Sequence, residues 1–431
     1  MTRNPFTRTA ALAGAAAIGA SAHSLLAQEY SFTKVADSAL DDFDPFSTGA
    51  PSLSDTGYVA FGTLSADQSS SRVLRSGADL ARPLVVIGDD QVNNEIGSFF
   101  NTVSVNNAGQ VSMWATISGP VFERILRGNG GPLELIAEAS DNEMFNFMSV
   151  ITSISDSGTV AWQGELNRAG FPQGLFTGNG GPVDTIFSTD SSDFTSSFAG
   201  PMINNAGQIA FRASTTTSDG DAIFRYDGGS SFVTIVDSSG PFSSFFDDEP
   251  AINDLGDVAV IAFSDDFSTS YVLVGNGVGA AVAVADTSGA LESINNAGIN
   301  DQGQVAFSAT FDDFFTQGIF TGPDLVADRV IGTGDELDGS VVTGVAMFRE
   351  GLNDSGQIAF LAFLDDGRAV VGVATPDCAA DFNGDGVVDT RDVLAFLNAW
   401  NADDSASDCT GDGTLDTRDV LCFLNLWNAG C

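Results

Sequence analysis

Short runs of alternating apolar and polar residues recur along the chain, and each run follows the same polar turn. The stretch Asn204 to Phe211 is typical: two Asn, Ala, Gly and Gln precede Ile-Ala-Phe. Asn and Ser side chains bond to nearby backbone in tight turns, and the glycine takes a positive φ there. The alternation that follows has the period of a half-buried strand. Each run therefore predicts a tight turn leading into a strand.

The turn and its strand occur seven times at a nearly constant step. The copies begin at Ser54, Asn106, Ser155, Asn204, Asn253, Asn300 and Asn353. A second strand and a glycine-rich turn follow each copy, as at 124–131, and then a third strand, as at 133–137. Repeats of about 40–50 residues that hold three or four strands are typical of propeller blades.

The two ends of the repeat region complement each other. The last unit stops at residues 369–374 and lacks the third strand that the earlier units have. Residues 32–37 align with the third strand of an earlier unit, Phe232 to Asp237. An N-terminal strand added to the last unit would close a ring and remove its open edges. We predict an all-β fold, a seven-bladed β-propeller over residues 28–375. An open β-solenoid and two stacked sandwiches are the alternatives.

Composition narrows the functional class. The net charge is −41, yet 43% of the residues are hydrophobic, which is too apolar for a disordered acidic tail. Nucleic acid is excluded as a partner because it requires a basic patch. Residues 1–27 have a positive start, an apolar run over 10–22 and a small residue before Gln28, which predicts a signal peptide. We expect a secreted or cell-surface protein with no transmembrane segment in the mature chain.

Two absences limit the chemistry. His23, the only histidine, falls inside the predicted signal peptide, and all four cysteines lie in the last 54 residues. Triads that need His, and zinc or copper sites that need His, are therefore excluded from the mature chain. We predict no catalytic residues and favour a protein that is not an enzyme. The remaining candidates for a ligand site are six carboxylates beside aromatic residues: Asp247, Asp248, Asp265, Asp266, Asp312 and Asp313. The alternative is that they are solvated loop residues.

The composition changes after Asp377. The stretch 381–392 fits a 12-residue calcium loop with oxygen ligands at positions 1, 3, 5, 7, 9 and 12 and Gly386 at position 6. The predicted ligands of this first loop are Asp381, Asn383, Asp385, Val387 through its carbonyl, Asp389 and Asp392. Apolar residues at helical spacing follow from Val393 to Trp400.

The loop and its helix repeat 27 residues later. The second set of predicted ligands is Asp408, Thr410, Asp412, Thr414 through its carbonyl, Asp416 and Asp419. Thr410 is a poorer ligand than Asn or Asp, so we expect weaker binding in this loop. Two loops predict two calcium ions.

Two loop–helix units without incoming helices resemble a dockerin domain, over residues 376–431. The ending Asn428-Ala-Gly-Cys431 is similar to the planctomycete variant that terminates in Gly-Cys. The resemblance implies a cohesin-like or cell-envelope receptor that binds residues 378–431. The repeats of the larger domain resemble the NxxGxxAF tandem repeats of exported bacterial proteins, a resemblance that implies no activity.

The internal repeat also suggests a cysteine pairing. Cys409 stands where Phe382 stands in the first unit, and Cys422 stands where Ala395 does. If Phe382 packs on Ala395, Cys409 and Cys422 should bond, which leaves Cys378 and Cys431 to join the ends. Four cysteines allow three connectivities.

The function expected from these patterns is non-catalytic binding or display by the propeller, which is docked or anchored through a calcium-dependent module. The propeller's ligand would be a polysaccharide or a protein. The alternative is a carbohydrate-active enzyme, a glycosidase or lyase that uses paired carboxylates.

Overall fold

The protein is described by a computed structural model that covers residues 30–92, 96–117, 121–140, 144–197, 200–216, 220–245, 250–383, 388–410 and 412–429. Internal contacts divide this part of the chain into two compact units, with the boundary between Asp377 and Cys378. The predicted signal peptide lies outside the described residues. Within them, no helix has both the length and the apolarity to cross a membrane.

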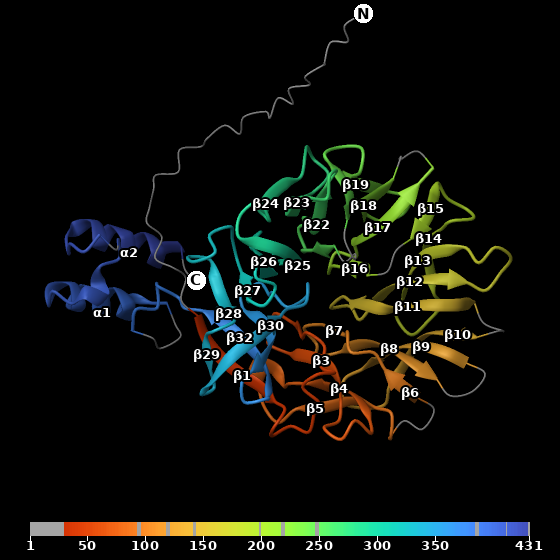
Figure 1. Ribbon diagram of the computed structural model, residues 1–431, viewed down its shortest axis with the longest axis horizontal. Helices are drawn as coiled ribbons and strands as arrows, with labels where there is room; N and C mark the ends of the chain where they lie inside the picture. The colour runs from red at the N-terminus through yellow and green to blue at the C-terminus, as the bar shows by residue number, and fades with distance from the viewer. Residues whose placement is uncertain are drawn as a thin grey trace, which may run out of the picture. The chain divides into compact units, whose positions relative to one another are not determined.

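The described strands of the larger unit form sheets of four, five or nine strands, and neighbouring strands are antiparallel at all but one contact (Figure 1). The first sheet has the order β2 (Ser52–Leu53), β3 (Val59–Leu64), β4 (Ser71–Arg75) and β5 (Val85–Asp89), with the 3-10 helix η1 (Ala78–Leu80) after β4. The next sheet has nine strands: β6 (Ile96–Phe99), β7 (Ser104–Val105), β8 (Val111–Ile117), β9 (Val121–Gly128), β10 (Glu134–Ser140), β11 (Phe145–Ile154), β12 (Val160–Leu166), β13 (Gln173–Gly178) and β14 (Asp184–Ser188).

Three further sheets continue the series. One holds β15 (Phe194–Ser197), β16 (Met202–Ile203), β17 (Ile209–Thr215), β18 (Asp221–Tyr226) and β19 (Phe232–Asp237). The next holds β20 (Phe242–Phe245), β21 (Ala251–Ile252), β22 (Val258–Ser264), β23 (Ser270–Gly275) and β24 (Val282–Asp286). The third holds β25 (Leu291–Ile299), β26 (Val305–Phe311), β27 (Gln317–Phe320) and β28 (Arg329–Gly332).

The last sheet joins the two ends of the unit, as the sequence predicts. It comprises β29 (Glu336–Leu337), β30 (Ser340–Ala346), β31 (Ile358–Leu364), β32 (Ala369–Pro376) and β1 (Tyr30–Asp37). Strand β1 runs antiparallel to β32, with Phe32 opposite Ala374 and Asp37 opposite Val370. The fold is therefore an all-β, propeller-like arrangement closed by its N-terminal strand.

The number of blades does not follow from the sheets alone. The described strands form six sheets, because one parallel contact, Ala139 opposite Phe145, links β10 to β11 and merges two repeat units into the nine-stranded sheet. The prediction of seven blades is thus not established by the strand ladders.

The repeated residues have the roles that their pattern indicates. The seven turn glycines all have φ between 70° and 83°. The aromatic residue of the following strand packs between sheets, as the buried Phe61, Trp162, Phe211 and Phe307 do. Phe211 and Phe224, opposite each other on the neighbouring strands β17 and β18, stack with ring centroids 5.7 Å apart.

The smaller unit contains two helices, α1 (Thr390–Asn401) and α2 (Thr417–Ala429), and the 3-10 helix η2 (Ser405–Ser407). The rings of Phe396 and Phe423 stack with centroids 4.2 Å apart. The indole of Trp400 donates to the carbonyl of Asp416 at 3.0 Å, and that of Trp427 donates to the carbonyl of Asp389 at 2.8 Å. The two loop–helix units therefore hold each other reciprocally.

A disulfide joins Cys409 to Cys422, with Cα atoms 5.9 Å apart, so this predicted pair is confirmed. In the first unit, Phe382 lies against the rings of Phe396 and Phe423. Cys378 is also disulfide-bonded. Its predicted partner, Cys431, lies outside the described residues.

Candidate functional site

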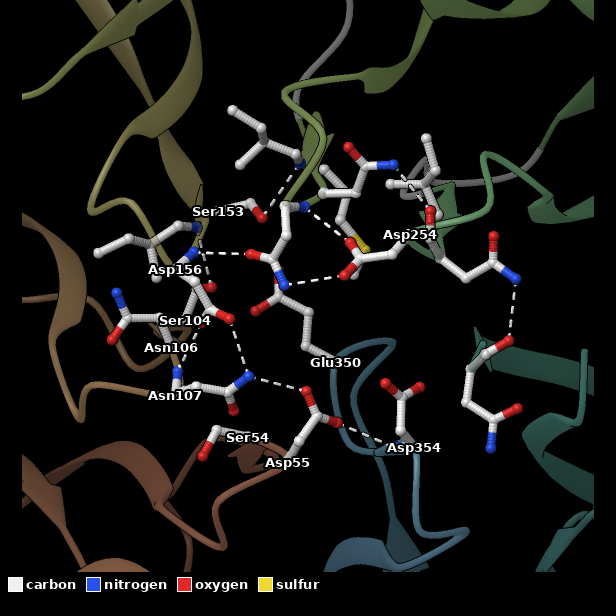
Figure 2. A pocket seen from close by; sticks show the side chains of 18 of the residues that line it. Ser54, Asp55, Ser104, Asn106, Asn107, Ser153, Asp156, Asp254, Glu350 and Asp354 are labelled. Atoms are coloured by element: carbon white, nitrogen blue, oxygen red, sulfur yellow. Dashed lines mark hydrogen bonds between the residues drawn. The ribbon is translucent and has the colours of Figure 1, made fainter. Parts of the chain in front are cut away.

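The seven repeated turns meet in a closed ring of hydrogen bonds. In each turn the residue after the leading Asn or Ser offers a side-chain oxygen to a backbone N–H of the preceding turn in the ring. The accepting residues are Asn107, Asp156, Asn205, Asp254, Asp301, Asp354 and Asp55, in that order around the ring. Figure 2 shows part of this ring, including the bonds of Asn107 to Asp55 and Asp156.

The leading residues form a second, deeper series of bonds. The amide of Asn204 donates to the carbonyl of Asn253 at 2.8 Å, and the amide of Asn353 donates to the carbonyl of Ser54 at 3.3 Å. Because these bonds join turns that are 47 to 53 residues apart or at opposite ends of the unit, the turns are fixed against one another. We call this end of the propeller the turn face.

Carboxylates crowd together on one side of the turn face. Asp254, Asp301, Asp354 and Asp55 follow one another around the ring, whereas Asn107 and Asn205 separate Asp156 from them. Burial, and then the neighbouring carboxylates, raise the pKa of Asp354. The pKa of Asp301 is raised too, first by burial and then by Asp254 and Asp55. This side of the ring is therefore strongly electronegative.

The ring surrounds a cavity of about 120 Å³ at the inner ends of the sheets. Ser104, Ser153 and Glu350 also line it, as Figure 2 shows. Next to Glu350 in the chain, Arg349 is fully buried and donates to the carbonyls of Gly200 and Pro201. This arginine thus links the last sheet to the sheet of β15–β19.

The opposite end of the propeller has a different chemistry. Here lie the hairpin turns between the second and third strand of each sheet and the connections between sheets; we call this end the hairpin face. Among the described residues of the unit, five exposed phenylalanines lie in these turns and connections: Phe46, Phe171, Phe267, Phe314 and Phe315. The molecule therefore presents a polar ring at one end and separate aromatic side chains at the other.

One acid on the hairpin-face side has an unusual environment. Glu123 of β9 is half-buried, accepts the backbone N–H of Met148 at 2.8 Å and lies 3.4 Å from the indole nitrogen of Trp114. Burial raises the pKa of Glu123, although these two donors oppose the shift.

The structure describes ten of the twelve predicted calcium ligands, while Asp385 and Val387 lie outside the described residues. Asp392 and Asp419, at position 12 of each loop, are fully buried. Asp392 accepts backbone N–H groups of Asn383 and Asp389, and Asp419 accepts those of Thr410 and Asp416. Each position-12 carboxylate thus ties the early part of its loop to the start of its helix.

The other described ligands do not converge in the same way. Arg418 lies 2.8 Å from Asp412 and 2.9 Å from Asp416, and Arg391 lies 2.7 Å from Asp389. Among the described residues, no group of three or more carboxylate, Cys or His side chains is close enough to share a metal ion. The donor set is nonetheless all oxygen, which suits a hard cation such as calcium.

Sequence reasoning found the turns but missed the ring. It assigned Asp55 and its counterparts to local turns, although an Asp or Asn at this position in every copy was the available signal. Of the carboxylates proposed beside aromatics, Asp265, Asp266, Asp312 and Asp313 fall in two hairpin turns of the hairpin face, while Asp247 and Asp248 lie outside the described residues. Nothing in the pattern indicated Arg349 or Glu350.

Comparison with known proteins places the chain in a family. Residues 9–267 match the model of a family of unknown function, DUF7453, and the chain therefore belongs to this family. No curated protein matches the chain.

Solved structures resemble the chain only distantly. The β-propeller domain of the trilobed protease from Pyrococcus furiosus is 10% identical, with a TM-score of 0.48, and the match covers 76% of this chain and 92% of that one. An oligogalacturonate lyase in complex with manganese is 8% identical, with a TM-score of 0.48 over 81% of this chain and 97% of that one. Prolyl oligopeptidase B from Galerina marginata is 11% identical, with a TM-score of 0.47 over 74% and 47% of the respective chains. Likenesses of this size carry no functional argument.

Proposed function

We propose that this is an exported binding or display protein, with a seven-bladed propeller as its binding domain and the C-terminal unit as a calcium-dependent attachment module. The observation that carries the proposal is the reciprocal construction of the smaller unit. Each loop is tied to its helix by a buried Asp, and each helix bonds the other loop through a Trp. Such a paired, disulfide-linked unit is suited to presenting a fixed surface to a receptor.

Seven blades are supported by the ring of the turn face. Its hydrogen bonds pass through seven turns, one for each repeat, and return from Asp354 to Asp55. In this interpretation the nine-stranded sheet contains two blades, with β11 beginning the second of them. Strand β1, from the other end of the unit, completes the last of these blades by pairing with β32.

Calcium would be held by the oxygens of Asp381, Asn383, Asp385, Asp389 and Asp392 in the first loop and by their counterparts in the second. Bound calcium supplies the positive charge that lets these acidic side chains lie close together. The chain's own residues place the position-12 carboxylates and set the direction of each helix. Loss of the ion would leave like charges adjacent and loosen the surface that a receptor contacts.

The test compares the full chain with the double variant Asp381→Ala/Asp408→Ala, which removes position 1 of both loops. Asp184→Ala/Asp193→Ala, two exposed acids of the propeller, is the matched control for charge. Calorimetric titration should detect calcium binding by the wild type and the control only. Retention on cell-envelope fragments should likewise be lost in the double variant or in EDTA. Absence of calcium binding by the wild type, or retention unaffected by EDTA, would overturn the proposal.

A carbohydrate-active enzyme is the second candidate, and Glu123 is the observation that favours it. A half-buried carboxyl group with a raised pKa beside an indole is a suitable general acid for glycosidic bonds. If this candidate is correct, the protein should cleave members of a polysaccharide panel and Glu123→Gln should abolish cleavage. If no polysaccharide is cleaved by the wild type, the second candidate is excluded.

A further inference from the structure

Two hairpin turns of the hairpin face expose phenylalanine in a conformation that disfavours it. Phe267, in the turn between β22 and β23, has φ 56° and is 65% exposed. Phe314, at the same place between β26 and β27, has φ 62° and is 66% exposed. Bulky residues are rare at positive φ, and an exposed ring gains little from burial. Folding alone would favour glycine here, and Gly367 fills the equivalent position between β31 and β32 with φ 87°.

The rest of each turn is satisfied internally. Asp266 accepts the N–H and hydroxyl of Ser268, and Asp313 accepts the N–H and hydroxyl of Thr316. The carboxylates of the preceding residues, Asp265 and Asp312, are exposed and meet no donor or cation within the described part of the chain. Each turn therefore exposes a phenylalanine ring at positive φ and one carboxylate without a described partner, and the second turn also exposes Phe315.

The charge around these turns is one-sided. From Asp227 to Asp328 the sequence has sixteen Asp and Glu residues and no Lys, Arg or His. The neighbouring sheet differs, because Arg368 and Lys34 pair with Asp338 and Asp37 beside the turn that holds Gly367. The exposed rings of Phe267 and Phe314 therefore lie in a stretch of the chain that contains acidic residues but no basic ones.

We propose that the hairpin turns of the sheets β20–β24 and β25–β28 bind a basic polypeptide segment. Guanidinium or ammonium groups would lie over the rings of Phe267 and Phe314 and pair with Asp265 and Asp312. A ring face and a nearby carboxylate both attract a cation, whereas they give a polyanion nothing to pair with. The ring of Phe267 lies 6.3 Å from that of Phe263, and Phe315 is exposed beside Phe314, so each turn offers a small aromatic surface. Two such surfaces on neighbouring hairpin turns suit cationic side chains spaced along an extended segment. This inference names the ligand class of the binding role proposed above and rests on it.

The test uses the full chain and a fluorescent peptide of about ten residues with alternating Arg and Gly. Phe267→Gly/Phe314→Gly should weaken binding about fivefold to tenfold, since two cation–π contacts are lost. Its melting temperature should match or exceed that of the wild type, because glycine relieves the positive φ. Phe171→Gly is the matched control: this exposed ring also has positive φ, at 45°, but its turn contains Arg168. That control should bind as the wild type does.

A second variant separates specific contact from general attraction. Asp265→Asn/Asp312→Asn should weaken binding and also reduce its dependence on salt. The proposal is overturned if the Phe267→Gly/Phe314→Gly variant binds the peptide like the wild type, or if the wild type prefers a neutral β-glucan to the peptide. Calcium-dependent retention on envelopes should be unchanged in every one of these variants, so failure here is distinguishable from failure of the attachment module.

Discussion

At the scale of single residues, the second position of each repeated turn combines two roles. Its side-chain oxygen accepts a neighbouring turn's N–H, a role that Asn and Asp perform equally well. Charge is what distinguishes them: Asn107 and Asn205 separate carboxylates, whereas Asp254, Asp301, Asp354 and Asp55 stand in an unbroken series. The hydrogen bonds stabilise the ring while the repulsion among these four residues opposes it.

Replacing Asp354 by Asn tests this balance. The pKa of Asp354 is raised in the folded state, so the native protein binds more protons than the unfolded chain between the two pKa values. Stability is therefore lost as the pH rises through that window. Asp354→Asn keeps the accepting oxygen and should raise the melting temperature at about pH 7, with the gain disappearing at about pH 3, below both pKa values. Differential scanning calorimetry across this range measures it.

Asp266 serves as a control, because the pKa of its carboxyl group is lowered in the folded state, whereas that of Asp354 is raised. Bonds from Ser268 and Ser264 hold its pKa at about 2. Its stabilising effect is present above the unfolded pKa and is lost as the pH falls through the folded one. Asp266→Asn should thus lower the melting temperature at neutral pH. A gain in both variants, or in neither, would contradict the electrostatic account of the ring.

At the scale of elements, the smaller unit shows how one repeat is stabilised in two ways. Asp389 caps α1 and forms a capping box with Asp392. At the start of α2, the backbone N–H of Asp416 donates to the carboxylate of Asp419 at 2.8 Å, as in the equivalent pair of α1. The first unit packs Phe382 on the ring of Phe396, and the second has the Cys409–Cys422 disulfide at the corresponding place. The disulfide therefore substitutes for aromatic packing.

Removal of the disulfide should cost stability in this unit only. Cys409→Ser/Cys422→Ser frees a loop of 13 residues, which should lower the free energy of unfolding of the smaller unit by about 2–3 kcal/mol. Calorimetry should show its transition at a lower temperature and the propeller transition unchanged. The variant Cys409→Phe/Cys422→Ala, which copies the first unit, should recover part of the loss. A shift of both transitions would show that the two units unfold together.

At the scale of the whole propeller, closure depends on contacts between residues far apart in sequence. Strand β1 completes the sheet of β30–β32 and buries Val35 and Ala36 in its core. Arg349 then joins that sheet to residues 200 and 201, across the ring. Breaking either contact should affect the cooperative unfolding of the entire ring.

Arg349→Met provides the direct measurement. It leaves the carbonyls of Gly200 and Pro201 without their charged donor in a buried place, and it removes the cation beside Glu350. Loss of one partner from a buried charged network typically costs about 3–5 kcal/mol. We expect a single propeller transition at a clearly lower melting temperature. Arg72→Met, at a partly exposed arginine paired with Asp42 and Asp89, should have a much smaller effect. Equal effects would contradict a special role for Arg349.

The sequence by itself determined what depends on local pattern. The turn glycines, the strands that follow them, the closing strand 32–37 and the pairing of Cys409 with Cys422 could be predicted because each rests on backbone conformation, alternation or internal repetition. The two helices after the predicted calcium loops follow from the same kind of signal. Only the tertiary structure decided which side chains meet around the ring. A residue such as Asp354 has its partner 299 residues away in the chain, and Arg349 has its own about 150 residues away. No periodicity records such pairs, because they arise when closure of the ring brings together repeats that are far apart in the sequence.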